Sequence, residues 1–329
     1  MKKVLLILMC CMAIQSVHAQ DTPKWADKAK KAVFSIVTYD KENKIKNTGN
    51  GFYIDNNGTA LSDYSLFEDA ERAVIINADG KELPVTRIAG ANSMYDVIKF
   101  RTKTEKKITA LKVATQPAAV GETVYLLPYS TQKAATCQTG KVTQVDTIAD
   151  KAYYYTLTMT TSDKTVSCPI MNANGEVLGL IQKSASEEDK ESYAIGASYG
   201  ESLSISPLSA NDINLNKIGI AKALPETEDQ ALVYLYMSSS QMDAKNYLAT
   251  LNDFLQAYPN STEGYTRRAG YYMNIGDDEH NALAEADLKK AMDVSGNKTE
   301  GQYNVAKIIY SYCINLEEGK KAYGVTTKH

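Results

Sequence analysis

Residues 48–71 read TGNGFYIDNNGTALSDYSLFEDAE, and this stretch decides the fold of the larger, N-terminal part of the chain. Two short runs rich in apolar and aromatic residues flank an Asn-Gly pair, which is a strong short-range signal for a β-hairpin. Similar runs, separated by Asn-Gly or Asp-Gly turns, continue from Ala32 to Pro207. Many short strands at this spacing indicate a sandwich or barrel. The expected strands are residues 32–39, 51–55, 72–77, 97–101, 123–128, 153–160, 177–182 and 193–198.

After Pro225 the apolar residues recur at helical spacing instead. Ser, Thr or Asp stands near the start of each segment and Gly or Pro near the end, as helix caps require. The charge also divides, with 24 basic and 24 acidic residues in 21–224 but 10 and 15 in 225–329. We therefore expect a β domain over 20–222 and an acidic helical domain over 223–329. The expected helices lie within 226–240, 243–259, 262–276, 282–294 and 300–319.

Residues 1–19 are predicted to be a cleaved signal peptide. Two lysines precede an apolar run from Val4 to Ile14, and Ala19 ends an A-x-A-like cleavage site before Gln20. The run is too short for the roughly 20 residues of a membrane span, which disfavours an uncleaved anchor. Cys10 and Cys11 lack the small preceding residue that lipidation requires. We therefore expect an exported protein, located in the periplasm, outside the cell or at the outer membrane.

The overall composition limits the class of partner. The chain has 36 basic and 39 acidic residues, a net charge of −3, and its 44% hydrophobic content is that of a folded protein. A mildly acidic protein is a poor candidate for binding nucleic acid or anionic membrane surfaces. No second long apolar run follows the leader, so we expect no membrane span. The composition leaves the oligomeric state open.

Six segments follow one another in a fixed order over about 150 residues. Among them are TGNGFYIDNNGTALSDYSLFEDAE, MYDVIKF at 94–100 and TVSCPIMNANGEVLGLIQ at 165–182. In this order and spacing they resemble the trypsin-like serine proteases, particularly the HtrA/Deg group. The resemblance implies an all-β double barrel, followed here by the helical domain. The remaining three segments are 119–130, 139–145 and 193–198.

The resemblance also implies where a catalytic triad would stand. The family's histidine falls on Ser65, its aspartate on Asp96 and its serine on Val166, so only the aspartate is kept. No histidine occurs anywhere between His18 and His280. A serine hydroxyl is a poor nucleophile unless a neighbouring base takes its proton, and valine offers no nucleophile. The sequence therefore predicts an inactive protease fold.

A rebuilt site is the alternative that the same loop leaves open. Lys164, Ser167 and Cys168 stand where the family has the glycines whose amides face the oxyanion. Ser167 or Cys168 could act as nucleophile with Lys164 as base if the lysine were desolvated. A solvated Lys164 would leave no such pair. Cys168 could instead form a disulfide with Cys137, or both could be buried thiols.

The resemblance implies a peptide-binding strand after this loop. In the family, that strand pairs with a substrate peptide through main-chain hydrogen bonds, as in β-augmentation. We therefore expect a free edge here. The residues concerned are Tyr193, Ala194, Ile195, Gly196, Ala197 and Ser198.

The helical half contains an internal repeat and resembles a tetratricopeptide array. Tyr265 and Tyr272 recur 38 residues later as tyrosines, and Tyr265, Ala269 and Tyr272 fall at packing positions of that repeat. Leu288 and Ala291 do so in the following helix. Arg268 departs from the pattern, because the repeat has an aliphatic residue there. A plain array of helical hairpins without a peptide groove is the alternative.

These observations predict an exported pseudoprotease that acts as an adaptor or scaffold and binds a protein or peptide partner. Two alternatives stay open: a trypsin-like endopeptidase with the rebuilt site, and a purely structural envelope protein. The acidic clusters lack ligand spacing, and His280 and His329 have no partner in sequence. We therefore expect no metal and no cofactor.

Overall fold

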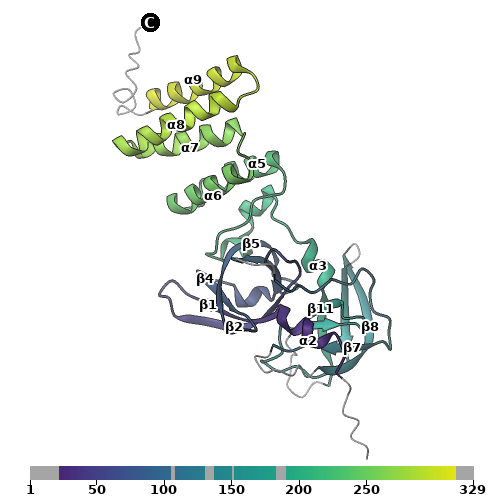
Figure 1. Ribbon diagram of the computed structural model, residues 1–329. Helices are drawn as coiled ribbons and strands as arrows, with labels where there is room; N and C mark the ends of the chain where they lie inside the picture. Colours follow the sequence, from purple (N-terminus) through teal and green to yellow (C-terminus); the bar gives the residue numbers. More distant parts are fainter. Residues whose placement is uncertain (1–21, 105–107, 130–136, 150–151, 183–189, 316–329) are drawn as a thin grey trace, which may run out of the picture.

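The computed structural model describes residues 22–104, 108–129, 137–149, 152–182 and 190–315 (Figure 1). Two closed six-stranded β-barrels are followed by a stack of helices. This is the trypsin-like double barrel with a helical region that the sequence predicts. The predicted signal peptide lies outside the described residues.

The first barrel has the strand order β1-β2-β3-β6-β5-β4 and closes through antiparallel pairing of β1 with β4. Inward-facing aromatic and aliphatic side chains fill its interior, including Phe34, Phe52 and Phe100, each of which is fully buried. Its strands are β1 Val33–Tyr39, β2 Ile45–Tyr53, β3 Thr59–Ser62, β4 Arg72–Ile76, β5 Glu82–Asn92 and β6 Val97–Thr102.

The second barrel repeats this architecture in the order β10-β11-β12-β9-β8-β7, and β7 pairs with β10 to close it. The Asn174-Gly175 turn joins β10 to β11, and Gly175 has a positive φ of 77°. A side chain there would collide with Trp25, whose indole N–H donates to Ala173 O at 3.0 Å. The strands are β7 Thr123–Leu126, β8 Gln138–Ala149, β9 Ala152–Leu157, β10 Pro169–Met171, β11 Val177–Ile181 and β12 Ser192–Gly196.

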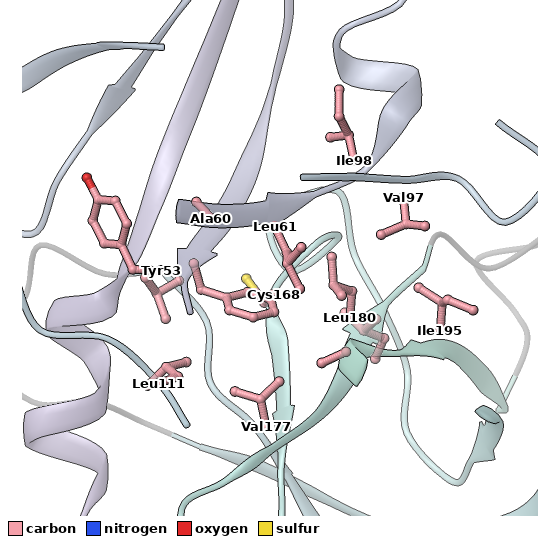
Figure 2. Close-up of a cluster of buried hydrophobic side chains, with 14 of the residues drawn as sticks. Tyr53, Ala60, Leu61, Val97, Ile98, Leu111, Cys168, Val177, Leu180 and Ile195 are labelled. Atoms are coloured by element: carbon pink, nitrogen blue, oxygen red, sulfur yellow. The ribbon is translucent and has the colours of Figure 1, made fainter. Parts of the chain in front are cut away.

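The two barrels share one hydrophobic core. Leu61 and Val97 from the first barrel and Leu180 and Ile195 from the second belong to the same cluster of buried side chains, shown in Figure 2. Cys168 lies in this cluster. Because the core continues from one barrel to the other, the two barrels are held as one unit.

Short helices precede the first barrel, lie between β3 and β4 and follow β12, and five longer ones come after them in the described residues. The short ones are α2 Ala26–Ala29, η2 Lys30–Ala32, η3 Tyr64–Leu66, α3 Ala197–Ser202, η4 Pro207–Asn211 and α4 Ile213–Asn216. The longer ones are α5 Glu228–Ser238, α6 Ala244–Ala257, α7 Thr262–Ile275, α8 Asp278–Val294 and α9 Lys298–Asn315.

The caps of the longer helices are the residues that mark their ends in the sequence. Thr227, Asp243, Ser261 and Asp277 each accept a hydrogen bond from a backbone amide in the first turn of α5, α6, α7 and α8. Gly276 ends α7 in the left-handed conformation that glycine tolerates best. Within the described ranges, no helix is both long enough and apolar enough to span a membrane.

The helical region is attached to the first barrel at β5. Ile88 N donates to Ala221 O at 2.8 Å and Ala223 N donates to Ile88 O at 2.7 Å, so the connecting segment forms a parallel bridge with β5. Arg87 Nε donates to Asp253 Oδ2 on α6 at 2.7 Å. Figure 1 shows α5 and α6 nearest to this barrel and α9 farthest from it.

Candidate functional site

Ser65 and Asp96, which the resemblance to serine proteases places at the histidine and aspartate positions, are in direct contact. Ser65 lies on η3 just after β3, and Asp96 lies in the turn between β5 and β6 with a φ of 47°. Ser65 N donates to Asp96 Oδ1 at 2.7 Å, and Ser65 Oγ donates to Asp96 Oδ2 at 3.0 Å. The carboxylate thus orients a hydroxyl where a protease orients an imidazole.

This pair cannot carry out the proton transfer that a triad requires. The imidazole of a triad accepts the proton of the nucleophile and later returns it, whereas a serine hydroxyl does not accept a proton near neutral pH. The barrels contain no histidine, and His280 lies on α8, where its ring contacts Asp277. Within the described residues, no group of three or more His, Cys, Asp or Glu side chains is arranged to hold a metal ion.

Val166, at the nucleophile position, lies in a loop closed by its own hydrogen bonds. Thr165 N and Val166 N both donate to Ser162 O, at 2.8 and 3.2 Å. Asn50 Nδ2, from β2, donates to Lys164 O at 3.1 Å and to Val166 O at 2.9 Å. In a serine protease the amide of this residue is one of the oxyanion donors, but here it is engaged inside the loop.

The residues of the suggested rebuilt site do not meet at a surface. Ser167 and Cys168 are both fully buried, and Ser167 N donates to Ile181 O at 2.9 Å. Burial raises the pKa of the Cys168 thiol to about 12, so it stays protonated and a weak nucleophile. Lys164 is exposed on the loop. This arrangement gives no support to a desolvated lysine acting on either side chain.

Asp63 is a feature of the site that sequence reasoning missed. It lies between β3 and η3, is 3% exposed, and its Oδ1 has no hydrogen-bond partner within the described residues. Burial raises the pKa of this carboxyl well above its usual range, and the nearby Asp96 charge raises it further. The Asp63 carboxyl lies near the Ser167 hydroxyl, which acts on its pKa. Ser167 Oγ nevertheless meets no hydrogen-bond criterion with any group among the described residues.

The signal for Asp63 was present in the sequence. It is an acidic residue placed directly after the apolar strand ALS, two positions before Ser65. An acidic residue in a buried run is unusual and marks a group whose charge the fold must suppress or pair. The site therefore contains two neighbouring carboxyl groups, one hydrogen-bonded to Ser65 and one whose pKa is raised by burial.

Comparison with known protein families agrees with this geometry. Residues 49–180 match the family of the trypsin-like peptidase domain, a range that runs from β2 to β11 and includes Ser65, Asp96 and Val166. A search of curated proteins found no match to the chain. The two barrels have a trypsin-like fold. The helical region lies outside the matched residues.

Of the two alternatives for Cys137 and Cys168, a disulfide or two buried thiols, the structure has the second, because both are free and buried. Cys137 directly precedes β8 and Cys168 directly precedes β10, and β7 lies between these two strands in the barrel. Strands separated by a third are about 10 Å apart, whereas a disulfide requires Cα atoms within about 7 Å. Burial also raises the pKa of Cys137, to about 11.

The expected free edge of the trypsin-like barrels at residues 193–198 is wrong. Residues Tyr193 to Gly196 belong to β12, which pairs with β11 on one side and β9 on the other. Tyr193 O accepts from Gln182 N at 2.8 Å, and Ala197 and Ser198 begin α3. Since the barrel is closed, these main-chain groups are already paired, and a peptide cannot add to them as an extra strand.

In the helical region, the residues singled out by the repeat pattern do pack together. Ala269, Leu288 and Ala291 are buried in one cluster with Tyr272. Arg268, the departure from the pattern, forms a two-pronged ion pair with Asp287 on α8. Its Nε and Nη2 donate to the two carboxylate oxygens at 2.7 Å each, and Nη1 reaches Asn252 on α6 at 2.7 Å. Arg268 therefore ties three helices together.

Proposed function

We propose that this protein is exported and acts by binding protein or peptide segments, as an adaptor or scaffold, without hydrolysing them. The observation that carries the proposal is the Ser65–Asp96 pair, which occupies the position where a protease holds its histidine. The closed loop around Val166 supports it independently. In this proposal the barrels are a support, and the helical region, a tetratricopeptide-like array, carries the binding surface.

The expected loss of catalysis is large. Removing one oxyanion donor from a serine protease costs on the order of 100- to 1,000-fold in rate. Removing the triad serine or histidine costs on the order of a million-fold. Val166 replaces the nucleophile, Ser65 replaces the base, and the Val166 amide is bound to Ser162 O. Each change alone would remove most activity, and together they leave no route for acyl transfer.

The exposed aromatic side chains of the helices support a binding role. Tyr236 on α5 is 69% exposed, Tyr303 on α9 is 66% exposed and Tyr310 is 60% exposed. Exposed tyrosines contribute large contact areas with little loss of side-chain entropy, which makes them frequent anchors at protein interfaces. Arg87 and the bridge at Ile88 fix α6 and the connecting segment to β5, so this end of the helical region is held on the first barrel.

The first arm of the test measures hydrolysis. We expect the purified mature chain to leave a fluorogenic unfolded polypeptide intact and to resist labelling by a fluorophosphonate. Turnover that disappears in Ser167→Ala or Cys168→Ala would overturn the proposal in favour of the rebuilt hydrolase. A catalytically active trypsin-like protease assayed in parallel shows that the substrate is cleavable.

The second arm measures binding. Peptides selected on the full chain from a displayed library should bind at least tenfold more weakly to the variant Tyr236→Ser, Tyr303→Ser, Tyr310→Ser. The matched control is Tyr193→Ser, because Tyr193 is an exposed tyrosine of the second barrel, and we expect it to bind like the wild type. Equal affinities of all three proteins would contradict a binding surface on the helices. A chain that selects no peptide would favour the purely structural role.

A further inference from the structure

A small cavity lies where the connecting segment meets α5 and α6. Its volume is about 220 Å³. Ile218, Ile220 and Met242 provide apolar walls, while Lys222, Tyr234 and Asn246 provide polar groups. Pockets for drug-sized ligands measure about 300 to 1,000 Å³, so this one suits a molecule of only a few heavy atoms.

Lys222 is held in this cavity by backbone groups. Its Nζ donates to Ile220 O at 2.9 Å and to Ile218 O. Its main chain is fixed as well, since the residues on both sides hydrogen-bond to Ile88 on β5. A lysine fixed at both ends presents its amine in one position, which is the preorganisation that a reactive group requires.

Lys222 has no bonded carboxylate. Among the described residues, no Asp or Glu oxygen lies within ion-pair distance of its nitrogen. The charge of the Glu71 carboxylate raises the pKa of Lys222. That carboxylate also lies 3.6 Å from Lys41 Nζ, so Lys222 shares it with a second cation. Asp243 lines the same cavity, but both of its oxygens accept hydrogen bonds from Asn246 at 2.8 Å.

Burial lowers the pKa of Lys222 to about 8. At pH 8 about half of its amine is therefore neutral, against about 0.4% for a lysine of ordinary pKa. A neutral amine has two hydrogens, which the carbonyls of Ile218 and Ile220 can accept, and a lone pair that remains available. The same hydrogen bonds that fix the side chain therefore leave its nucleophilic electron pair free.

Tyr234 supplies the complementary group. It lines the same cavity, and no hydrogen bond to its hydroxyl is formed within the described residues. Burial raises the pKa of Tyr234 to about 12, so the hydroxyl stays protonated and can donate. A cavity that combines a neutral amine with an unpaired hydroxyl donor can attack a carbonyl carbon and hydrogen-bond its oxygen.

We propose that Lys222 and this cavity form a site that captures a small, unhindered aldehyde as an imine. The neutral Nζ adds to the carbonyl carbon, and the oxygen takes up a proton to give a carbinolamine. Loss of one water, which carries away that oxygen and the two amine hydrogens, leaves the C=N bond. No oxidant or reductant is needed. Tyr234 hydrogen-bonds the aldehyde oxygen during the addition, and the apolar walls hold the carbon chain.

The test is reductive trapping on the full mature chain. Propanal and cyanoborohydride are added at pH 8, and the propylated lysines are mapped by peptide mass spectrometry over time. Lys217 is the matched control, since it is exposed, lies five residues earlier and has its pKa raised by the hydrogen bond to Glu68. We expect Lys222 to react about tenfold faster or more, because its larger neutral fraction outweighs its lower basicity.

Two variants separate the cavity from general lysine reactivity. Tyr234→Phe removes the hydroxyl donor, and Asn246→Trp places a large side chain at an exposed position of the cavity wall. Both should slow labelling of Lys222 severalfold and leave Lys217 unchanged, with native circular dichroism showing that each variant folds. Equal rates at Lys222 and Lys217 in the wild type, or rates at Lys222 that neither variant changes, would overturn the proposal.

Discussion

Among the described residues, the barrels and the helical region each bury one aspartate, and they treat it in opposite ways. Asp287 on α8 is 6% exposed and receives both prongs of the Arg268 guanidinium. Asp63 in the first barrel is 3% exposed, and its nearest polar neighbours are another carboxyl, Asp96, and the Ser167 hydroxyl. One carboxyl is bound by a guanidinium, whereas the other has no cationic partner among the described residues and its pKa is raised by burial.

The difference shows what each polar group contributes. The Arg268 pair joins α6, α7 and α8, so its polar atoms stabilise packing. Asp63, Ser65 and Asp96 lie close together, and Asp63 Oδ1 has no hydrogen-bond partner within the described residues. A carboxyl kept neutral by burial costs stability whenever the solution is alkaline enough to ionise it in the unfolded chain. The three predictions below test this contrast.

Arg268→Leu should produce the largest loss of stability. It leaves Asp287 buried without its ion-pair partner, and removing one member of a buried pair costs about 3 to 5 kcal/mol. We expect the helical region to unfold at lower urea concentration, as followed by circular dichroism at helical wavelengths. The second variant, Arg268→Leu with Asp287→Leu, should recover most of the loss. An equal loss in both variants would mean that the arginine's packing matters and its charge does not.

Asp63→Asn should change how stability depends on pH. Because burial raises the pKa of Asp63 in the folded state, its stabilising contribution is complete below the unfolded pKa and declines as pH rises towards the folded pKa. Asparagine resembles the neutral acid and does not ionise. The stability of the variant relative to wild type should therefore increase as pH rises above the unfolded pKa of the aspartate, about 3.9.

Asp55→Asn is the control, because the pKa of Asp55 is shifted in the opposite direction to that of Asp63. Burial opposes ionisation of Asp55, but hydrogen bonds from Thr59 and Asn57 lower its pKa overall. Wild type should therefore lose stability relative to this variant as pH falls, the reverse of the trend at Asp63. Urea unfolding of both variants between pH 3 and 8 distinguishes the two trends. Parallel pH profiles for wild type and Asp63→Asn would show that folding does not change the pKa of Asp63.

The sequence was most informative where the relevant pattern is local. The strands β1, β4, β6 and β11 were predicted closely because their side chains are β-branched or aromatic and turns bound them. β5 was missed, since Pro84 and Gly90 interrupt its pattern. The register of β5 against β6 shifts between Ile88 and Gly90. The strand therefore accommodates Gly90 at a β-bulge or similar break in the pairing.

Site features that depend on distant strands were harder to predict. The order of the family motifs located Ser65 and Asp96, because Ser65 lies within the motif at 48–71 and Asp96 directly precedes the recognisable strand β6. The free edge at Tyr193 failed because β12 is paired by β9 and β11, which the local sequence does not reveal. The local sequence likewise could not decide between a disulfide and two buried thiols at Cys137 and Cys168, since it does not reveal that β7 separates them. The hydrogen bonds from Asn50 to the Val166 loop had no signal in sequence at all.

The smallest expected effect is that of restoring the missing triad residues. Ser65→His with Val166→Ser places an imidazole beside Asp96 and a hydroxyl in the loop, yet we expect hydrolysis of a fluorogenic peptide to remain at background. The loop is still held by Asn50, and the amide at position 166 still donates to Ser162 O. An oxyanion would therefore form without that donor, a deficit of about 3 to 4 kcal/mol.

A third substitution then separates the loop from the triad. Adding Asn50→Gly to Ser65→His and Val166→Ser removes both hydrogen bonds from β2 to the loop carbonyls. If the closed loop is what withholds activity, the triple variant should exceed the double variant in burst labelling by a fluorophosphonate. Full activity in the double variant would show instead that the loop opens readily, and that two side chains alone separate this fold from an enzyme.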